Sequence, residues 1–131
     1  MTTIPTRIQR RRAKGATTPP SAKYCGRPGK WGNPFVVNKI EANYYRVAII
    51  TVDWVLQMAA VAVFLDSGSA GFDTKEAATM HAVKCFGVLM ARMPERYPVD
   101  ELRQYTHLSC WCKLGEPCHV DEIIKRIKLI T

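Results

Sequence analysis

Three cysteines and a histidine lie close together near the end of the chain and have the residue types of a metal or nucleophile site. The segment reads Cys110-Trp111-Cys112, five intervening residues, and then Cys118-His119. Three thiolates and one imidazole are a common ligand set for zinc. The spacing is unusual, because paired zinc ligands commonly have two to four residues between them. We therefore predict a candidate zinc site formed by Cys110, Cys112, Cys118 and His119.

Three other interpretations fit the same segment. Cys118 can be a nucleophile with His119 or His107 as its base, because the start of a helix stabilises a thiolate. Alternatively, a catalytic metal can have three protein ligands and one open position. Finally, Cys110 and Cys112 can be small core residues, since free cysteine is among the most buried residue types.

A glycine-rich loop with two cations forms a second candidate site. Glycines let the backbone approach a ligand closely, and Arg27 and Lys30 supply positive charge, a combination suited to phosphate. The candidate phosphate-binding residues are Gly26, Arg27, Lys30, Gly32 and Asn33. The loop does not have the pattern of a P-loop. The alternative is a rigid architectural loop pinned by Trp31, Pro34 and Phe35.

The net charge of +8 is concentrated at the start of the chain. Residues 1–30 contain eight basic residues and no acidic one, while the rest of the chain is balanced. A basic arm attracts nucleic acid through its phosphates. The candidate contacts are Arg7, Arg10, Arg11, Arg12 and Lys14. The alternative is a solvated terminus without a partner.

The pattern of apolar residues predicts a small α/β domain with a short, mostly parallel sheet and flanking helices over residues 23–131, preceded by an extended arm over residues 1–22. The expected elements are a strand over residues 23–27, a helix over 43–65, a helix capped by Asp73, a strand over 107–112 and a helix from residue 117. If the two strands are parallel, the loop and the cysteine segment both follow strand carboxyl ends, where open α/β sheets bind ligands.

The remaining candidates have simpler explanations. Cys25 and Cys85 are expected in the core, His81 on the surface, and Asp53 is either a lone catalytic carboxylate or part of a solvated helix face.

The chain has 131 residues, and its sequence favours a protein that stays inside the cell. Its longest uncharged apolar stretch, residues 54–65, is shorter than the roughly 20 residues that span a bilayer. No apolar segment follows the N-terminal arginines as it would in a signal peptide. Five cysteines without an export signal favour thiols or metal ligands over disulfides. We expect a cytoplasmic protein that does not contact a membrane.

Two boxes carry a resemblance to a known family. The sequence reads GRPGKWGNPF over residues 26–35, and CWC followed by PCH over residues 110–119. These boxes resemble an uncharacterised domain of unknown function in small bacteriophage and bacterial proteins, and the resemblance spans nearly the whole chain. It implies that the two boxes act as one site, in a protein of an infected bacterial host. The chain departs from the pattern at residues 16–18 and at Cys25, where an aliphatic residue is usual.

Together these patterns predict a phage-type protein that binds, and could process, a phosphate-bearing ligand such as a nucleotide or nucleic acid. The alternative is a non-enzymatic module that binds nucleic acid or a host protein and has a structural Cys/His site. Either prediction requires the two boxes to be neighbours in space.

Overall fold

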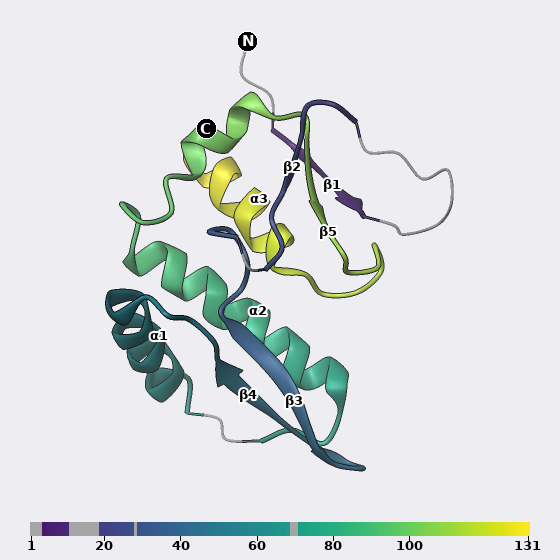
Figure 1. Cartoon of the computed structure of the whole chain (residues 1–131), viewed down its shortest axis with the longest axis vertical. Coiled ribbons are helices and arrows are strands. Elements are labelled where there is room, and N and C mark those ends of the chain that lie inside the picture. The colour runs from purple at the N-terminus through teal and green to yellow at the C-terminus, as the bar shows by residue number, and fades with distance from the viewer. Residues whose placement is uncertain (1–3, 11–18, 28, 69–70) are drawn as a thin grey trace.

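The computed structural model describes residues 4–10, 19–27, 29–68 and 71–131 of a small single-domain α/β protein. A three-stranded parallel sheet has the order β1–β5–β2 (Figure 1). Its strands are β1 (Thr6–Gln9), β2 (Ala22–Tyr24) and the central β5 (His107–Cys110). Because β2 and β5 are parallel, the glycine-rich loop and the cysteine segment leave the same edge of the sheet, as the sequence predicted.

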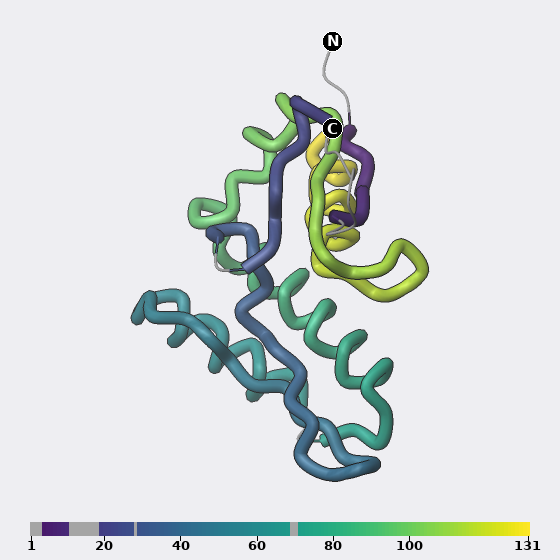
Figure 2. The backbone as a smooth tube through the Cα atoms, turned by 45° about the vertical axis from the view of Figure 1, so that its right-hand side comes forward, coloured from purple at the N-terminus to yellow at the C-terminus, as the bar shows by residue number. Residues whose placement is uncertain are grey.

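The first described residues belong to this sheet and not to an extended arm. Thr6 pairs with His107 and Gln9 with Cys110, and Figures 1 and 2 show the purple β1 beside β5. The prediction of an arm over residues 1–22 is therefore wrong for residues 6–9. A strand of four residues is too short to reveal a period in a basic sequence. Arg11, Arg12 and Lys14 lie outside the described residues.

An antiparallel hairpin replaces the first half of the helix predicted over residues 43–65. It consists of β3 (Phe35–Glu41) and β4 (Tyr44–Ile49), and Phe35 pairs with Ile49. The helix itself, α1 (Trp54–Ser67), begins only after the hairpin. The β-branched residues Val47 and Ile49 favour a strand, and this preference prevails over the helical spacing of the apolar residues.

Helix α2 (Lys75–Arg92) lies between the hairpin and the last helix, α3 (His119–Leu129) (Figure 1). Its N-cap is Thr74, whose side chain accepts from the backbone N–H of Ala77, so the prediction that Asp73 caps this helix is wrong by one residue. The side chains of α2 that face the core are buried at Ala78, Ala82, Cys85, Phe86 and Leu89.

A single hydrophobic core joins the two sheets through α2 and α3. A short 3-10 helix, η1 (Val99–Gln104), connects α2 to β5 and packs against α3. The apolar face of α3 buries Val120, Ile123 and Ile127. Within the residues that the structure describes, no helix has the length and apolarity needed to span a membrane.

Candidate functional site

The sulfur atoms of Cys110, Cys112 and Cys118 converge at the carboxyl end of β5. All three lie within 4.8 Å of one another, a separation that allows them to share a metal ion. The sulfur atoms of Cys110 and Cys118 are 2.8 Å apart. Sulfur ligands of a tetrahedral zinc ion lie about 3.8 Å apart, given Zn–S bonds of about 2.3 Å. A zinc ion therefore requires only small movements of these side chains.

Chain geometry explains why three cysteines with such irregular spacing meet. The strand predicted over residues 107–112 ends at Cys110, so the following turn, and not strand alternation, positions Cys112. Cys118 is the N-cap of α3, and its side chain makes no capping hydrogen bond. Cys110 and Cys118 are 1% exposed, whereas Cys112 is half-buried. The cluster is thus a closed site with Cys112 nearest to solvent.

The three thiols share their charge unequally. Hydrogen bonds from the thiols of Cys110 and Cys118 lower the pKa of Cys112 to about 2. The same contacts, with burial, raise the pKa of Cys118, and the contact with Cys112 raises that of Cys110. Without a metal, ionisation within the cluster therefore favours Cys112 over Cys118. A buried, protonated Cys118 is not typical of a free nucleophile, which needs a thiolate. It is more typical of a metal ligand, which loses its proton when the metal binds.

His119 lies beside this cluster but outside the group of three sulfur atoms that are mutually within reach. Its Nε2 donates to the carbonyl oxygen of Cys25 at 2.5 Å, which assigns the ring hydrogen to Nε2 because a carbonyl only accepts. Its Nδ1 is 3.8 Å from Sγ of Cys118. Burial lowers the pKa of His119, so the ring is neutral. A neutral ring held by a backbone carbonyl is typical of a metal-binding histidine.

Arg7 holds the turn that carries Cys112. Its guanidinium is 2.6 Å from a carboxylate oxygen of Asp121 on α3 and donates at 2.5 Å to the carbonyl of Lys113. The side chain is only 9% exposed. Arg7 was a predicted contact to nucleic acid, but its charged head is used inside the protein. Arg10 lies over the rings of Tyr24 and Trp111.

The glycine-rich loop consists of two successive turns. The N–H of Gly29 donates to the carbonyl of Gly26 at 3.1 Å, and the N–H of Gly32 donates to that of Gly29 at 3.0 Å. A Cβ on Gly32 would lie 2.8 Å from the backbone of Arg27, so only glycine allows this approach. The amides of Gly29 and Gly32 are thus used within the loop. Phosphate contacts must come chiefly from side chains.

Two buried residues attach this loop to the core. Asn33 donates to the carbonyl of Ala82 in α2 at 3.2 Å and accepts from the N–H of Phe35 at 2.9 Å. Trp31 is 4% exposed, and its ring packs against that of Tyr97. Asn33 therefore has a structural role in place of the predicted phosphate contact.

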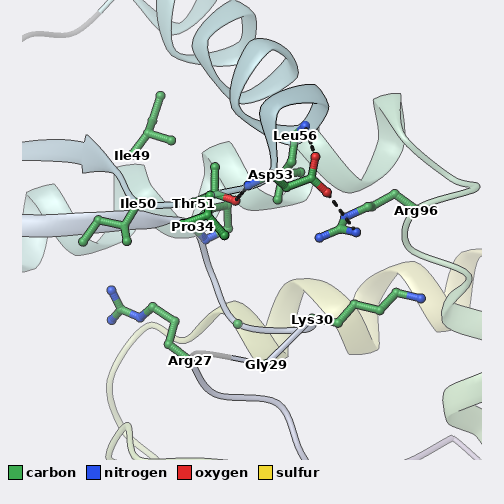
Figure 3. A pocket seen from close by; sticks show the side chains of 12 residues that line it. Arg27, Gly29, Lys30, Pro34, Ile49, Ile50, Thr51, Asp53, Leu56 and Arg96 are labelled. Atoms are coloured by element: carbon green, nitrogen blue, oxygen red, sulfur yellow. Dashed lines mark hydrogen bonds and ion pairs between the residues drawn. The ribbon is translucent and has the colours of Figure 1, made fainter.

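A cavity of about 690 Å³ lies between the loop and the segment that joins β4 to α1 (Figure 3). Arg27, Gly29, Lys30 and Gly32 border it on one side. The apolar lining comes from Pro34, Ile49, Ile50, Val52 and Leu56. Of the predicted phosphate-binding residues, Arg27, Lys30 and Gly32 line this cavity, whereas Gly26 and Asn33 do not.

An ion pair that the sequence did not reveal forms the far end of the cavity. Asp53 accepts from the N–H of Leu56 as the N-cap of α1, and its other oxygen is 3.3 Å from Arg96 (Figure 3). Asp53 is thus neither a lone catalytic carboxylate nor a purely solvated one. The role of Arg96 has no local sequence signal, because it depends on how the end of α2 meets α1.

The two boxes are neighbours, as the sequence required, but they do not share one pocket. The hydrogen bond from His119 to Cys25 joins the second box to the residue that precedes the first, and the N–H of Cys25 donates to the carbonyl of Ser109 in β5 at 2.8 Å. None of the clustered cysteines lines the cavity of Figure 3. The metal-type cluster is thus separate from the lining of the cationic cavity.

The chain belongs to a family described as a domain of unknown function (DUF4326), whose model matches residues 8–129. The match covers both the cysteine cluster and the glycine-rich loop. Comparisons with curated proteins and with solved structures give no match.

Proposed function

We propose that the protein binds a phosphate-bearing ligand, of the nucleotide class, in the cavity between the glycine-rich loop and the β4–α1 segment. The observation that carries this proposal is the position of the Arg27 side chain. Its guanidinium borders the cavity and has no hydrogen bond or ion pair among the described residues. A guanidinium that is free to form two parallel hydrogen bonds is suited to a phosphate.

The other charges of the cavity support an anionic ligand. Lys30 has one weak, exposed ion pair, with Nζ 3.8 Å from Glu101. The carboxylate of Asp53 is already balanced by Arg96 at 3.3 Å. Arg27 and Lys30 therefore leave the cavity with positive charge, which attracts an anion and strengthens its binding.

The apolar lining favours a ligand that is larger than phosphate alone. Ile49, Ile50 and Leu56 lie across the cavity from Arg27 and offer an apolar surface to a base or a sugar. A volume of about 690 Å³ is within the usual range for small-molecule sites, roughly 300–1,000 Å³. The combination of an apolar wall and a cationic rim matches a nucleotide better than a bare anion.

Zinc at the cysteine cluster is the second part of the proposal. Cys110, Cys112 and Cys118 supply three thiolates, which are soft ligands that favour zinc over magnesium or calcium. Nδ1 of His119 is the fourth donor, after a small shift toward the sulfur atoms. A closed set of four protein ligands is typical of a structural metal. The metal would fix the edge of the sheet from which the glycine-rich loop departs.

Titration calorimetry of the purified chain tests ligand binding, with ADP, pyrophosphate, adenosine and a short single-stranded oligonucleotide as probes. Arg27→Ala should weaken ADP binding by about tenfold or more, since a charge-assisted hydrogen bond contributes about 1.5–3 kcal/mol. Arg46→Ala is the matched control, because Arg46 is an exposed arginine outside this cavity. ADP should bind more tightly than adenosine.

Three results would contradict the cavity assignment. One is the absence of saturable binding of ADP or pyrophosphate. The others are equal affinity of the wild type and Arg27→Ala for ADP, and equal affinity of the wild type for ADP and adenosine. Binding of the oligonucleotide with no binding of ADP would favour the nucleic-acid alternative.

Metal analysis tests the cysteine cluster independently. We expect one zinc per chain in protein purified without chelator. Cys118→Ser should lose the metal, whereas Cys85→Ser should keep it, because Cys85 is a buried cysteine on α2 outside the cluster. Retention of zinc by Cys118→Ser, or equal metal loss in both variants, would contradict the assignment.

A further inference from the structure

One face of α1 exposes apolar side chains at regular helical positions. Trp54, Met58, Val61 and Leu65 are 70%, 59%, 40% and 74% exposed. Their separations of four, three and four residues place them in one stripe along the helix. In Figures 1 and 2, α1 lies at the edge of the molecule.

The opposite face of α1 is already buried inside the fold. Leu56, Ala60 and Val63 are buried, and α1 packs against α2. A helix that is apolar on every side is normally buried on every side. The stripe on α1 therefore requires a partner outside the fold.

The lack of charge along the stripe limits the kinds of partner that can bind it. Between Asp53 and Asp66, α1 has no charged residue, and Gln57 is its only polar one. Each of the two acids is paired, Asp53 with Arg96 at 3.3 Å and Asp66 with Arg92 at 2.6 Å. The stripe thus offers no charge to a nucleic acid or to a charged peptide, and its partner must present an equally neutral apolar surface.

We propose that the partner is a second copy of this chain, with the two α1 helices antiparallel about a two-fold axis. An axis between Met58 and Val61 places Met58 against Val61 of the other copy and Trp54 against Leu65. Each larger side chain then opposes a smaller one, and the same stripe serves both copies, as a two-fold interface requires. The antiparallel arrangement also aligns opposite helix-dipole ends.

The exposed area is adequate for a stable pair. The stripe consists of Trp54, Met58, Val61 and Leu65, each 40–74% exposed, and Val55 beside it on α1 is 65% exposed. One aromatic residue alone supplies about 150–250 Å², so the stripe can form the apolar centre of an interface in which each partner buries roughly 800 Å². Monomers rarely leave a patch of this size uncovered.

Sedimentation equilibrium of the full chain tests this proposal without reference to ligand binding. The wild type should be a dimer at micromolar concentration, and Met58→Glu and Val61→Glu should each weaken dimerisation by about tenfold or more, because each buries a charge at the centre of the seam. Leu129→Glu is the control, since Leu129 is 71% exposed on α3, away from α1, and should leave the dimer intact. Circular dichroism confirms that the variants are folded.

A pair of charge variants tests the antiparallel register. Trp54→Lys and Leu65→Glu should each be mainly monomeric, and mixing them should restore a dimer, because Lys at position 54 then faces Glu at position 65. A monomeric wild type would overturn the proposal and assign the stripe to a different partner. Dimers that persist in both glutamate variants, or a mixture without recovery, would overturn the interface or its register.

Discussion

The side chain of Asn33 should contribute more to stability than its place in a surface loop suggests. It is 8% exposed and makes two hydrogen bonds, one to the carbonyl of Ala82 and one from the N–H of Phe35. The first bond connects the loop to α2, and the second fixes the start of β3. Asn33→Ala removes both and leaves the N–H of Phe35 without this partner.

The expected cost follows from these two contacts. A hydrogen bond contributes about 1 kcal/mol net, and a buried donor that loses its partner costs about 1–3 kcal/mol. We therefore expect Asn33→Ala to lower the free energy of unfolding by about 2–4 kcal/mol. Small domains have only about 5–15 kcal/mol in total, so the loss is large. Asn33→Asp should also be destabilising, because it places a carboxylate beside the Ala82 carbonyl in a buried position.

Urea unfolding followed by circular dichroism measures this change, with the metal content held equal in all samples. Asn38→Ala is the matched control, because Asn38 is exposed on β3, and its substitution should change the free energy by less than about 0.5 kcal/mol. Equal stability of the two variants would refute the reasoning that Asn33 is a structural anchor. It would also reopen a direct ligand role for its amide.

Three further predictions concern separate parts of the fold. Arg7→Met should lower the free energy of unfolding by about 2 kcal/mol, because it leaves the Lys113 carbonyl without a charged donor. A free energy of unfolding in urea equal to that of the wild type would contradict this. Gly32→Ala should destabilise the protein and weaken ADP binding together, since its Cβ would lie 2.8 Å from the backbone of Arg27; an unchanged melting temperature and affinity would refute the close approach. Burial raises the pKa of Cys85 above its ordinary 9.0, so the unfolded chain releases this proton first and stability should fall as the pH rises above about 9. Between pH 8 and 10, the free energy of unfolding should fall less for Cys85→Ala than for the wild type. Parallel curves of this free energy against pH for the two proteins would contradict the prediction.

The sequence predicted α2 and α3 well because periodicity and turn chemistry agree there. Three- and four-residue separations fit the buried faces that include Phe86 and Ile123, and Pro117 indicated the start of the last helix to within two residues, since α3 begins at His119. The departure of the glycine-rich loop and the cysteine segment from one edge of the sheet was also predictable, since two parallel strands bring their following loops to the same edge.

Other elements have patterns that conflict with their structure. Residues 44–49 have apolar spacing that fits a helix, but pairing with β3 stabilises them as a strand. β1 has only four residues and a basic sequence, so its pairing with β5 depends on contacts far along the chain. The structural role of Asn33 depends on a carbonyl of α2, and the pairing of Arg96 with Asp53 depends on tertiary packing. Local propensity contains no signal for such contacts.

The link between the two boxes has a structural consequence for ligand binding. The Cys25 carbonyl accepts from His119, and two residues further along the chain Arg27 borders the cavity. If a metal fixes the His119 ring, it also restricts the backbone from which Arg27 projects. We therefore expect chelation to weaken ADP binding even though the metal does not face the cavity.

Chemical-shift mapping of the full chain by nuclear magnetic resonance, with pyrophosphate as the titrant, tests the location of the phosphate site most directly. Saturable shifts are expected at the backbone amides of Arg27, Gly32 and Thr51, which surround the cavity. Amides that remain unshifted there, or shifts centred on Lys84 and Gly87 in the groove between α2 and α3, would contradict it.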